Sequence, residues 1–329
     1  MSLRFLIVLL MALFAGMPRA LPAQEVLDQI RALSSGNAQA YASPLVEGLN
    51  LAITGGFADR ARPMKPFGFD LSFRILAALP SAEQERFTAI LPDSFVWNGT
   101  SYLAPYETTG PDGTSPTIVG TGVGATLAPQ GAFERDLLQA GLDPDDFRVI
   151  LPGGLDLPAV PLVVFQGAVG VGFGTEVALR FLPAVEISPE VGALRSHGLS
   201  VHHAVSHWFS SPVDLMVTLG LQDASAGHYL QSTSTSLGLL AGVNAGPMSF
   251  LGGTLLRDAS TELRWKVENP GENPALPADG LDLSFQSQAR GDPSYLLGAR
   301  LQLLALNLSG HYLFGSYRLV SLKLGLGLP

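Results

Sequence analysis

A strict alternation of apolar and other side chains runs through residues 67–75, FGFDLSFRI. The apolar parity holds Phe67, Phe69, Leu71, Phe73 and Ile75, and the other parity holds Gly68, Asp70, Ser72 and Arg74. Successive side chains of a β-strand point to opposite faces of its sheet. The segment therefore predicts a strand with one apolar and one polar face.

The same period of two recurs along most of the chain. It is found in residues 163–173, 177–185, 213–222, 262–268, 281–286, 295–303 and 320–328. Several of these runs reach the roughly 9 to 11 residues that a tilted strand needs to cross a bilayer, whereas ordinary strands average about 5 or 6. The pattern predicts long, two-faced strands.

Composition separates the two folds that such strands build. The chain is 47% hydrophobic and only 14% charged, and soluble domains carry about 25% charged residues. A soluble sandwich with a dry inside needs a charged surface, whereas a membrane barrel turns its apolar faces outward. We therefore predict an all-β, antiparallel transmembrane β-barrel. At roughly 25 residues per strand it would have about 12 strands, within a range of about 10 to 14.

Charge and cysteine content exclude several classes of function. The net charge is -9, and without a cluster of Lys and Arg the chain has no surface for a phosphate backbone, so nucleic acid is not expected as a partner. The chain contains no Cys, which excludes disulfides, cysteine-bound zinc and a thiol nucleophile. We predict no cofactor.

The N-terminus has the layout of a secretory signal peptide. Residues 1–23 combine an early positive charge, an apolar run over residues 5–14, and small residues before a cut after Ala23, with Ala20 as the alternative site. Export followed by insertion of long strands predicts the outer membrane of a Gram-negative cell. Residues 24–329 are expected to form a single outer-membrane barrel domain.

Two segments do not follow the strand pattern. Residues 24–47 begin with Val26, Leu27, Ile30 and Leu33 at helical spacing, which predicts a short N-terminal helix that either plugs the barrel or packs on its rim. Residues 80–161 are expected to form one long irregular loop or plug region, or a region with two irregular strands. A short helix is expected near Phe133 and Leu142.

Charged residues on the polar parity are the candidates for lining the lumen. They are Glu176, Arg180, Glu262, Arg264, Lys266 and Glu268. Such residues either pair across strands or form a constriction that sets an ion preference.

A cluster of histidines and serines raises the question of catalysis. His197, His202, His203 and His207 fall within 11 residues, but on a strand His202 points away from His203, so three imidazoles do not converge on a metal. Ser200 and His202 share a face without an evident third partner. We therefore predict no metal site, no catalytic residue and no enzyme.

Four stretches resemble an uncharacterised family of Gram-negative outer-membrane β-barrel proteins, itself distantly similar to long-chain fatty acid and hydrocarbon transporter barrels. They are residues 60–73 (RARPMKPFGFDLSF), 115–120 (SPTIVG), 172–183 (GFGTEVALRFLP) and 198–208 (GLSVHHAVSHW). The resemblance implies the barrel fold and the outer-membrane location, and it carries no catalytic residues.

Three functions remain open on the sequence. The leading hypothesis is the passage of small or hydrophobic molecules across the outer membrane, with outer-membrane lipid and small hydrophobic solutes as partners. The alternative is a structural or assembly barrel that presents loops to a protein partner. An outer-membrane lipid hydrolase is the remote alternative.

Overall fold

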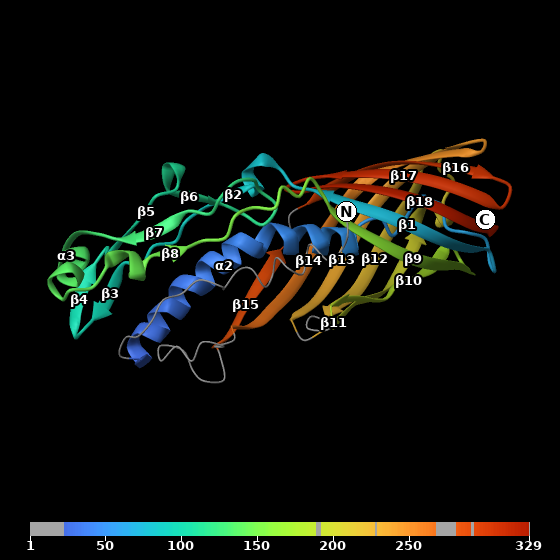
Figure 1. The fold of residues 1–329 in the computed structure, drawn as a ribbon. Coiled ribbons are helices and arrows are strands. Elements are labelled where there is room, and N and C mark those ends of the chain that lie inside the picture. The colour runs from blue at the N-terminus through green and yellow to red at the C-terminus, as the bar shows by residue number, and fades with distance from the viewer. Residues whose placement is uncertain (1–22, 189–191, 228, 268–280, 291–292, 329) are drawn as a thin grey trace. The chain divides into compact units, whose positions relative to one another are not determined.

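The computed structural model describes residues 23–188, 192–227, 229–267, 281–290 and 293–328 (Figure 1). The chain divides into two compact units, whereas the sequence analysis expected one barrel domain. Of the described residues, those within 46–81, 158–262 and 286–328 form one unit, and those within 23–45, 82–157 and 263–285 form the other.

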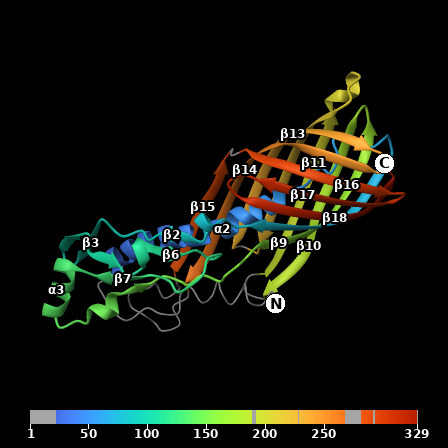
Figure 2. The ribbon, with the colours of Figure 1, turned by 90° about the horizontal axis from the view of Figure 1, so that it is seen from above.

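Ten strands of the first unit form a closed antiparallel barrel, in which each strand pairs with the next along the chain and the last pairs with the first. They are β1 (Phe69–Leu79), β9 (Val160–Gly172), β10 (Thr175–Ser188), β11 (Gly192–Ala204), β12 (Asp214–Ala226), β13 (Leu230–Ala245), β14 (Met248–Val267), β16 (Ser294–Leu303), β17 (Leu306–Phe314) and β18 (Arg318–Leu328). Strand β15 (Leu281–Arg290) pairs with β14 outside the ring. Figure 2 shows the two walls of the barrel, one behind the other.

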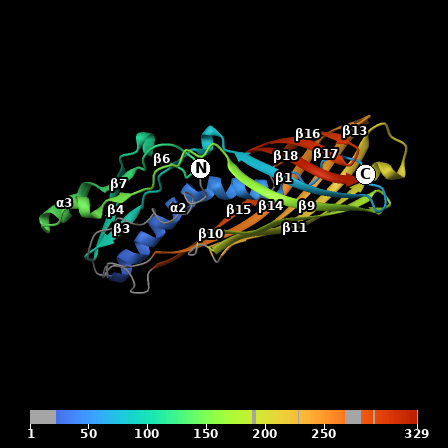
Figure 3. The same cartoon turned by 45° about the vertical axis from the view of Figure 1, so that its right-hand side comes forward.

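The walls are inside-out relative to those of a soluble barrel. On β1 the apolar residues Leu71 and Ile75 are 62% and 45% exposed, whereas Asp70 and Arg74 are 2% and 0% exposed. Their neighbours follow the same rule, because β1 lies in register between β9 and β18 (Figure 3). The barrel fold predicted from the alternation is confirmed.

The strand number is ten, so the value of about 12 is corrected to the lower end of the predicted range. Two causes are visible in the described residues. Strands β13 and β14 are 16 and 20 residues long, and residues 82–157 contribute no strand to the ring. Dividing chain length by an average number of residues per strand therefore overcounts.

The second unit has its own apolar core between residues 82 and 157, where the sequence analysis expected an irregular loop or plug region. Its elements are the 3-10 helices η1 (Ala82–Gln84), η2 (Pro111–Gly113) and η3 (Pro144–Phe147), the strands β2 (Arg86–Thr88), β3 (Ser94–Trp97), β4 (Thr100–Leu103), β5 (Tyr106–Thr108), β6 (Thr114–Pro116), β7 (Thr126–Pro129) and β8 (Val149–Ile150), and the helix α3 (Gly131–Gln139). Helix α3 confirms the short helix predicted near Phe133. Its Phe133 is fully buried and its ring lies 5.1 Å from that of Phe95 and 5.2 Å from that of Tyr102. Phe133 is therefore the central side chain of this aromatic core.

Helix α2 (Ala23–Thr54) is longer than the predicted segment of residues 24–47. In the second unit, its Tyr41 donates a hydrogen bond of 3.0 Å to the carbonyl oxygen of Gly153. Burial raises the pKa of Tyr41 to about 12, so the hydroxyl stays a neutral donor. Among the described helices, none is both long and apolar enough to span a bilayer. A last 3-10 helix, η4 (Val205–Trp208), lies between β11 and β12.

Candidate functional site

The inside of the barrel is filled by residues 46–64, which we call the plug segment. It comprises the last turns of α2 and an irregular stretch after Thr54, and it leads directly into β1. Its apolar residues Leu51, Ile53 and Phe57 are at most 7% exposed. Side chains from strands on all sides of the ring contact it, as the following contacts show.

The plug backbone is held first by Arg180 and Gln166, which point inward from β10 and β9. Arg180 donates hydrogen bonds of 3.0 and 2.8 Å to the carbonyl oxygens of Ile53 and Gly55. Gln166 donates one of 2.9 Å to the carbonyl oxygen of Phe57 and accepts two from Arg180. The guanidinium of Arg180 also lies 3.8 Å from the centre of the Phe57 ring. Two wall residues thus satisfy plug carbonyls where the helix ends.

Asp59 is the centre of a buried ion cluster. Its carboxylate lies 2.7 Å from Arg300 Nη1 of β16 and also binds Lys323 Nζ of β18. Asp70, at the start of β1, completes the cluster at 2.8 Å from Lys323 and 3.4 Å from Arg300. All four side chains are at most 5% exposed. The plug therefore supplies one of the two carboxylates that neutralise two wall cations.

A second ion pair binds the plug to the opposite wall. Arg60 Nη2 lies 2.9 Å from Glu176 Oε2 of β10, and the same oxygen accepts a hydrogen bond of 3.1 Å from the backbone N–H of Met64. Near the end of the plug, Arg62 pairs with Asp214 of β12 at 3.1 Å. Because removing one partner of a buried pair leaves an uncompensated charge, the Arg60–Glu176 pair resists withdrawal of the plug, whereas Arg62 is 67% exposed and its pair contributes little.

A neutral network holds the helical part of the plug. Asn50 donates a hydrogen bond of 2.8 Å to Thr261 of β14 and accepts one of 2.7 Å from Ser232 of β13. All three side chains are at most 5% exposed. The amide thus has partners on two adjacent strands, as a buried polar group requires.

Two wall glycines allow the plug to come close. A Cβ atom at Gly242 of β13 would lie 2.8 Å from Cβ of Ala61, and one at Gly170 of β9 would collide with the carbonyl oxygens of Met64 and Lys65. Glycine is the residue that permits such an approach between a backbone and its neighbour. The Gly-rich inner parity of the wall therefore fits an occupied lumen.

Glu176 and Arg180 are the predicted lumen residues whose side chains bind the plug in the described part of the chain. Glu176 and Arg180 both point inward and are buried, but they bind different parts of the plug. Glu262 is partly buried and Arg264 is exposed. The side chain of Lys266 and the whole of Glu268 lie outside the described residues.

The sequence analysis missed Asp59, Asp70, Arg300 and Lys323. Asp70 and Lys323 lie on the polar parity of the two alternating strands that begin and end the barrel, so inward charges at both positions could have been predicted as a pair. Asp59 lies in a segment without periodicity, and no sequence signal connects it to Arg300.

The histidines lie in different environments. His202 is 1% exposed inside the barrel and its Nε2 lies 2.7 Å from Ser200 Oγ. His203 Nδ1 lies 2.9 Å from Thr175 Oγ1, and its Nε2 accepts a hydrogen bond from Trp208. In the described part of the chain, no three His, Asp or Glu side chains gather as metal ligands. Ser200 and His202 do meet, but both are buried, and within the described residues no hydrogen bond joins His202 to Glu176, its partner across the strands.

The fold and this interior define a class of protein, an up-and-down antiparallel β-barrel with an internal plug. The chain belongs to the family of unknown function DUF6588, which matches residues 1–328. A comparison with curated proteins finds no match.

Solved structures similar to the chain include outer-membrane barrels. The beta domain of the Bordetella autotransporter Brka matches with 11% identity and a TM-score of 0.26, over 80% of this chain and 99% of that one. Pseudomonas aeruginosa OccK7 (OpdD) matches with 9% identity and a TM-score of 0.22, over 80% and 98%. A BenF-like porin from Pseudomonas fluorescens Pf-5 matches with 8% identity and a TM-score of 0.22, over 80% and 98%.

Proposed function

We propose that this protein is an outer-membrane β-barrel whose lumen is closed by the plug segment, and that it anchors the unit of residues 82–157 to the membrane. The observation that carries the proposal is the ion cluster of Asp59, Asp70, Arg300 and Lys323. It joins the plug to the wall in a buried environment. In an open pore, the side chains that line the lumen would be exposed to water.

The membrane location is supported by the outer surface of the barrel. Large apolar side chains are exposed on the outward parity all around the ring, among them Leu179, Phe181, Leu199, Leu219, Leu239, Leu297, Leu308 and Leu324. Exposed aromatic residues, Phe173, Trp208 and Phe209, lie at the hairpin end of β9 to β12. An apolar band with aromatic residues at its border is what a lipid-facing barrel presents. The signal peptide predicted in residues 1–23 would supply the export step.

The anchoring role is supported by the position of the insertion. Residues 82–157 fall between β1 and β9, and Ala78 pairs directly with Val160, so the chain leaves and re-enters the barrel at adjacent positions. The inserted unit has its own apolar core. A barrel that carries a separately packed insertion can hold it at a membrane surface without passing a solute. We assign no catalytic role to this arrangement.

Passage of small or hydrophobic molecules is the second candidate. The favourable observation is that the plug forms no strand of the ring and is held inside it by side-chain contacts. In this function the plug must leave the lumen.

The test begins with membrane fractionation and with gel migration before and after boiling. Outer-membrane recovery with heat-modifiable migration is expected, and a soluble protein with unchanged migration would contradict the membrane location. The purified full chain is then recorded in planar bilayers. The anchor function predicts no steady conductance, whereas a steady open conductance of the wild-type protein would overturn closure and favour passage.

A further inference from the structure

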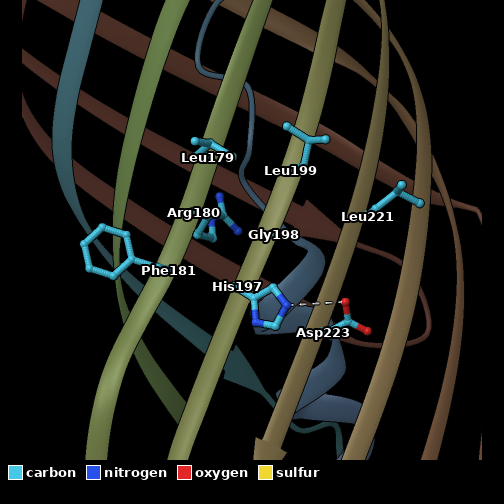
Figure 4. Close-up of a pocket in the computed structure, with 8 residues that line it drawn as sticks. All are labelled: Leu179, Arg180, Phe181, His197, Gly198, Leu199, Leu221 and Asp223. Atoms are coloured by element: carbon cyan, nitrogen blue, oxygen red, sulfur yellow. Dashed lines mark ion pairs between the residues drawn. The ribbon is translucent and has the colours of Figure 1, made fainter.

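The outer face of β10, β11 and β12 carries a hollow of about 370 Å³ (Figure 4). Two rows of outward side chains border it. One row is apolar and consists of Leu179, Leu199 and Leu221; the other consists of Phe181, His197 and Asp223. The hollow thus begins in the apolar band and ends at the first polar groups beside it.

A second hollow of about 200 Å³ continues from the first. The two share His197 and Asp223, and the second is bordered by polar and charged residues further along the strands, which are Arg195, Ser225, Gln231 and Thr233. Together they form a groove that is apolar at one end and charged at the other. We call it the border groove.

The charged and titratable side chains of the border groove are exposed, and one of them is fixed by a hydrogen bond. Asp223 Oδ1 accepts a hydrogen bond of 2.9 Å from Thr233 Oγ1, which fixes the carboxylate, and its Oδ2 lies 3.7 Å from His197 Nε2. The side chains of His197 and Asp223 remain 78% and 54% exposed. Arg195 is exposed and borders the second hollow. Arg195 and Asp223 lie diagonally on neighbouring strands, because Arg195 pairs with Ser225 and Asp223 pairs with His197, and diagonal neighbours on one face are about 7 to 8 Å apart.

We propose that the border groove binds a phospholipid with a phosphoethanolamine headgroup. An acyl chain lies along Leu179, Leu199 and Leu221. The phosphate accepts hydrogen bonds from Arg195 and His197, and the ammonium pairs with Asp223. The diagonal placement of Arg195 and Asp223 lets one side chain reach the phosphate and the other the ammonium of the same headgroup. The inference rests on the proposed membrane location and adds a lipid class to it.

The charge pattern selects this lipid over two others. An anionic headgroup without a cation places negative charge beside Asp223, which is unfavourable. A choline headgroup has no N–H to donate to that carboxylate, so it forfeits a charge-assisted hydrogen bond. Phosphatidylethanolamine satisfies both charged residues.

The test measures lipid retained by the purified full chain. Delipidated protein is titrated in detergent with phosphatidylethanolamine, phosphatidylglycerol or phosphatidylcholine, and bound lipid is counted by native mass spectrometry. Wild-type protein is expected to prefer phosphatidylethanolamine. Arg195→Gln and Asp223→Asn should each weaken its binding roughly tenfold, about the factor that one charge-assisted hydrogen bond supplies. Arg318→Gln is the control, because Arg318 begins β18 and lies away from the groove.

Two results would overturn the lipid site. One is equal retention of the three lipids by the wild-type protein, and the other is wild-type retention by both groove variants. Heat-modifiable migration, measured on the same samples, separates this failure from that of the membrane location. A heat-modifiable barrel without lipid preference would overturn only the proposed lipid site. A soluble protein would overturn the proposed membrane function as well.

Discussion

Asp59 is the plug residue with the largest share of the buried charge interactions. It neutralises Arg300 and Lys323 together with Asp70. In Asp59→Asn, two wall cations would face one carboxylate in an environment that excludes water. Breaking a buried ion pair in this way costs about 3 to 5 kcal/mol. We expect the unfolding midpoint of the barrel, followed by gel migration against temperature, to fall clearly.

A surface carboxylate provides the matched control. Asp145 pairs with Arg148 at 2.8 Å, but their side chains are 60% and 48% exposed. Asp145→Asn should change stability by less than about 1 kcal/mol, as exposed pairs do. Equal midpoints for Asp59→Asn and the wild-type protein would mean that the plug does not depend on this cluster.

Gly242 tests the close approach of plug and wall. In Gly242→Ala the new methyl group would meet Cβ of Ala61 and the carbonyl oxygen of Phe250, both at 2.8 Å. Overpacking of this kind costs about 1 to 3 kcal/mol. Gly310→Ala is the control, because its methyl group would make an ordinary contact of 3.6 Å with Leu322. Denaturant titration should separate the two variants, and a Gly242→Ala protein as stable as the control would show that the lumen has room to spare.

At the scale of elements, the strands could be predicted because each carries its own signal. The alternation in residues 67–75 and 320–328 corresponds to β1 and β18, which pair with each other and close the ring. Alternation indicates that a strand has two different faces, and the low content of charged residues indicates that the apolar face is outside. Neither signal indicates how many residues lie outside the ring, and for this reason the predicted strand number was too high.

The plug could not be predicted in the same way. Residues 50–64 are surrounded by polar wall groups and mix Asn, Asp and Arg with apolar residues, so neither period appears in them. The charged run of residues 262–268 lies beyond Met248–Leu255, the part of β14 that pairs with β16 in the described residues. Within this run Glu262 is partly buried and Arg264 is exposed. Its place on a lumen face stays a prediction.

Helix α3 tests whether the inserted unit folds independently of the barrel. Phe133 packs against Phe95, Tyr102 and Tyr106, and truncating a buried aromatic side chain costs about 3 to 5 kcal/mol. Phe133→Ala should open residues 82–157 to limited proteolysis while heat-modifiable migration persists. Leu138→Ala, on the same helix but 59% exposed, should leave both unchanged. Loss of heat-modifiable migration in Phe133→Ala alone would show that the barrel needs the inserted unit.

At the scale of the whole molecule, one chain combines a closed ring, an internal plug and an inserted unit. An up-and-down barrel has no free strand edge, so no insertion is needed to cover one. The plug precedes β1 directly and contacts β9, β10, β13, β14, β16 and β18. The ring and the plug therefore stabilise each other, and contacts from most of the ring hold the plug inside the lumen.

A disulfide between plug and wall tests closure directly. The chain has no Cys, and a Cβ atom at Gly56 would lie 3.4 Å from Cβ of Ser321, close to the separation of about 3.5 to 4.5 Å that a disulfide spans. Gly56 has a φ of +68°, so a Cys there also carries backbone strain of about 1 to 2 kcal/mol. The protein with Gly56→Cys and Ser321→Cys should be silent in planar bilayers, oxidised or reduced. Adding Asp59→Asn should produce a conductance only after reduction, because only then can the weakened plug leave the lumen. Equal conductance of that triple variant before and after reduction would show that ions pass without movement of residues 46–64, and the plug would no longer account for closure.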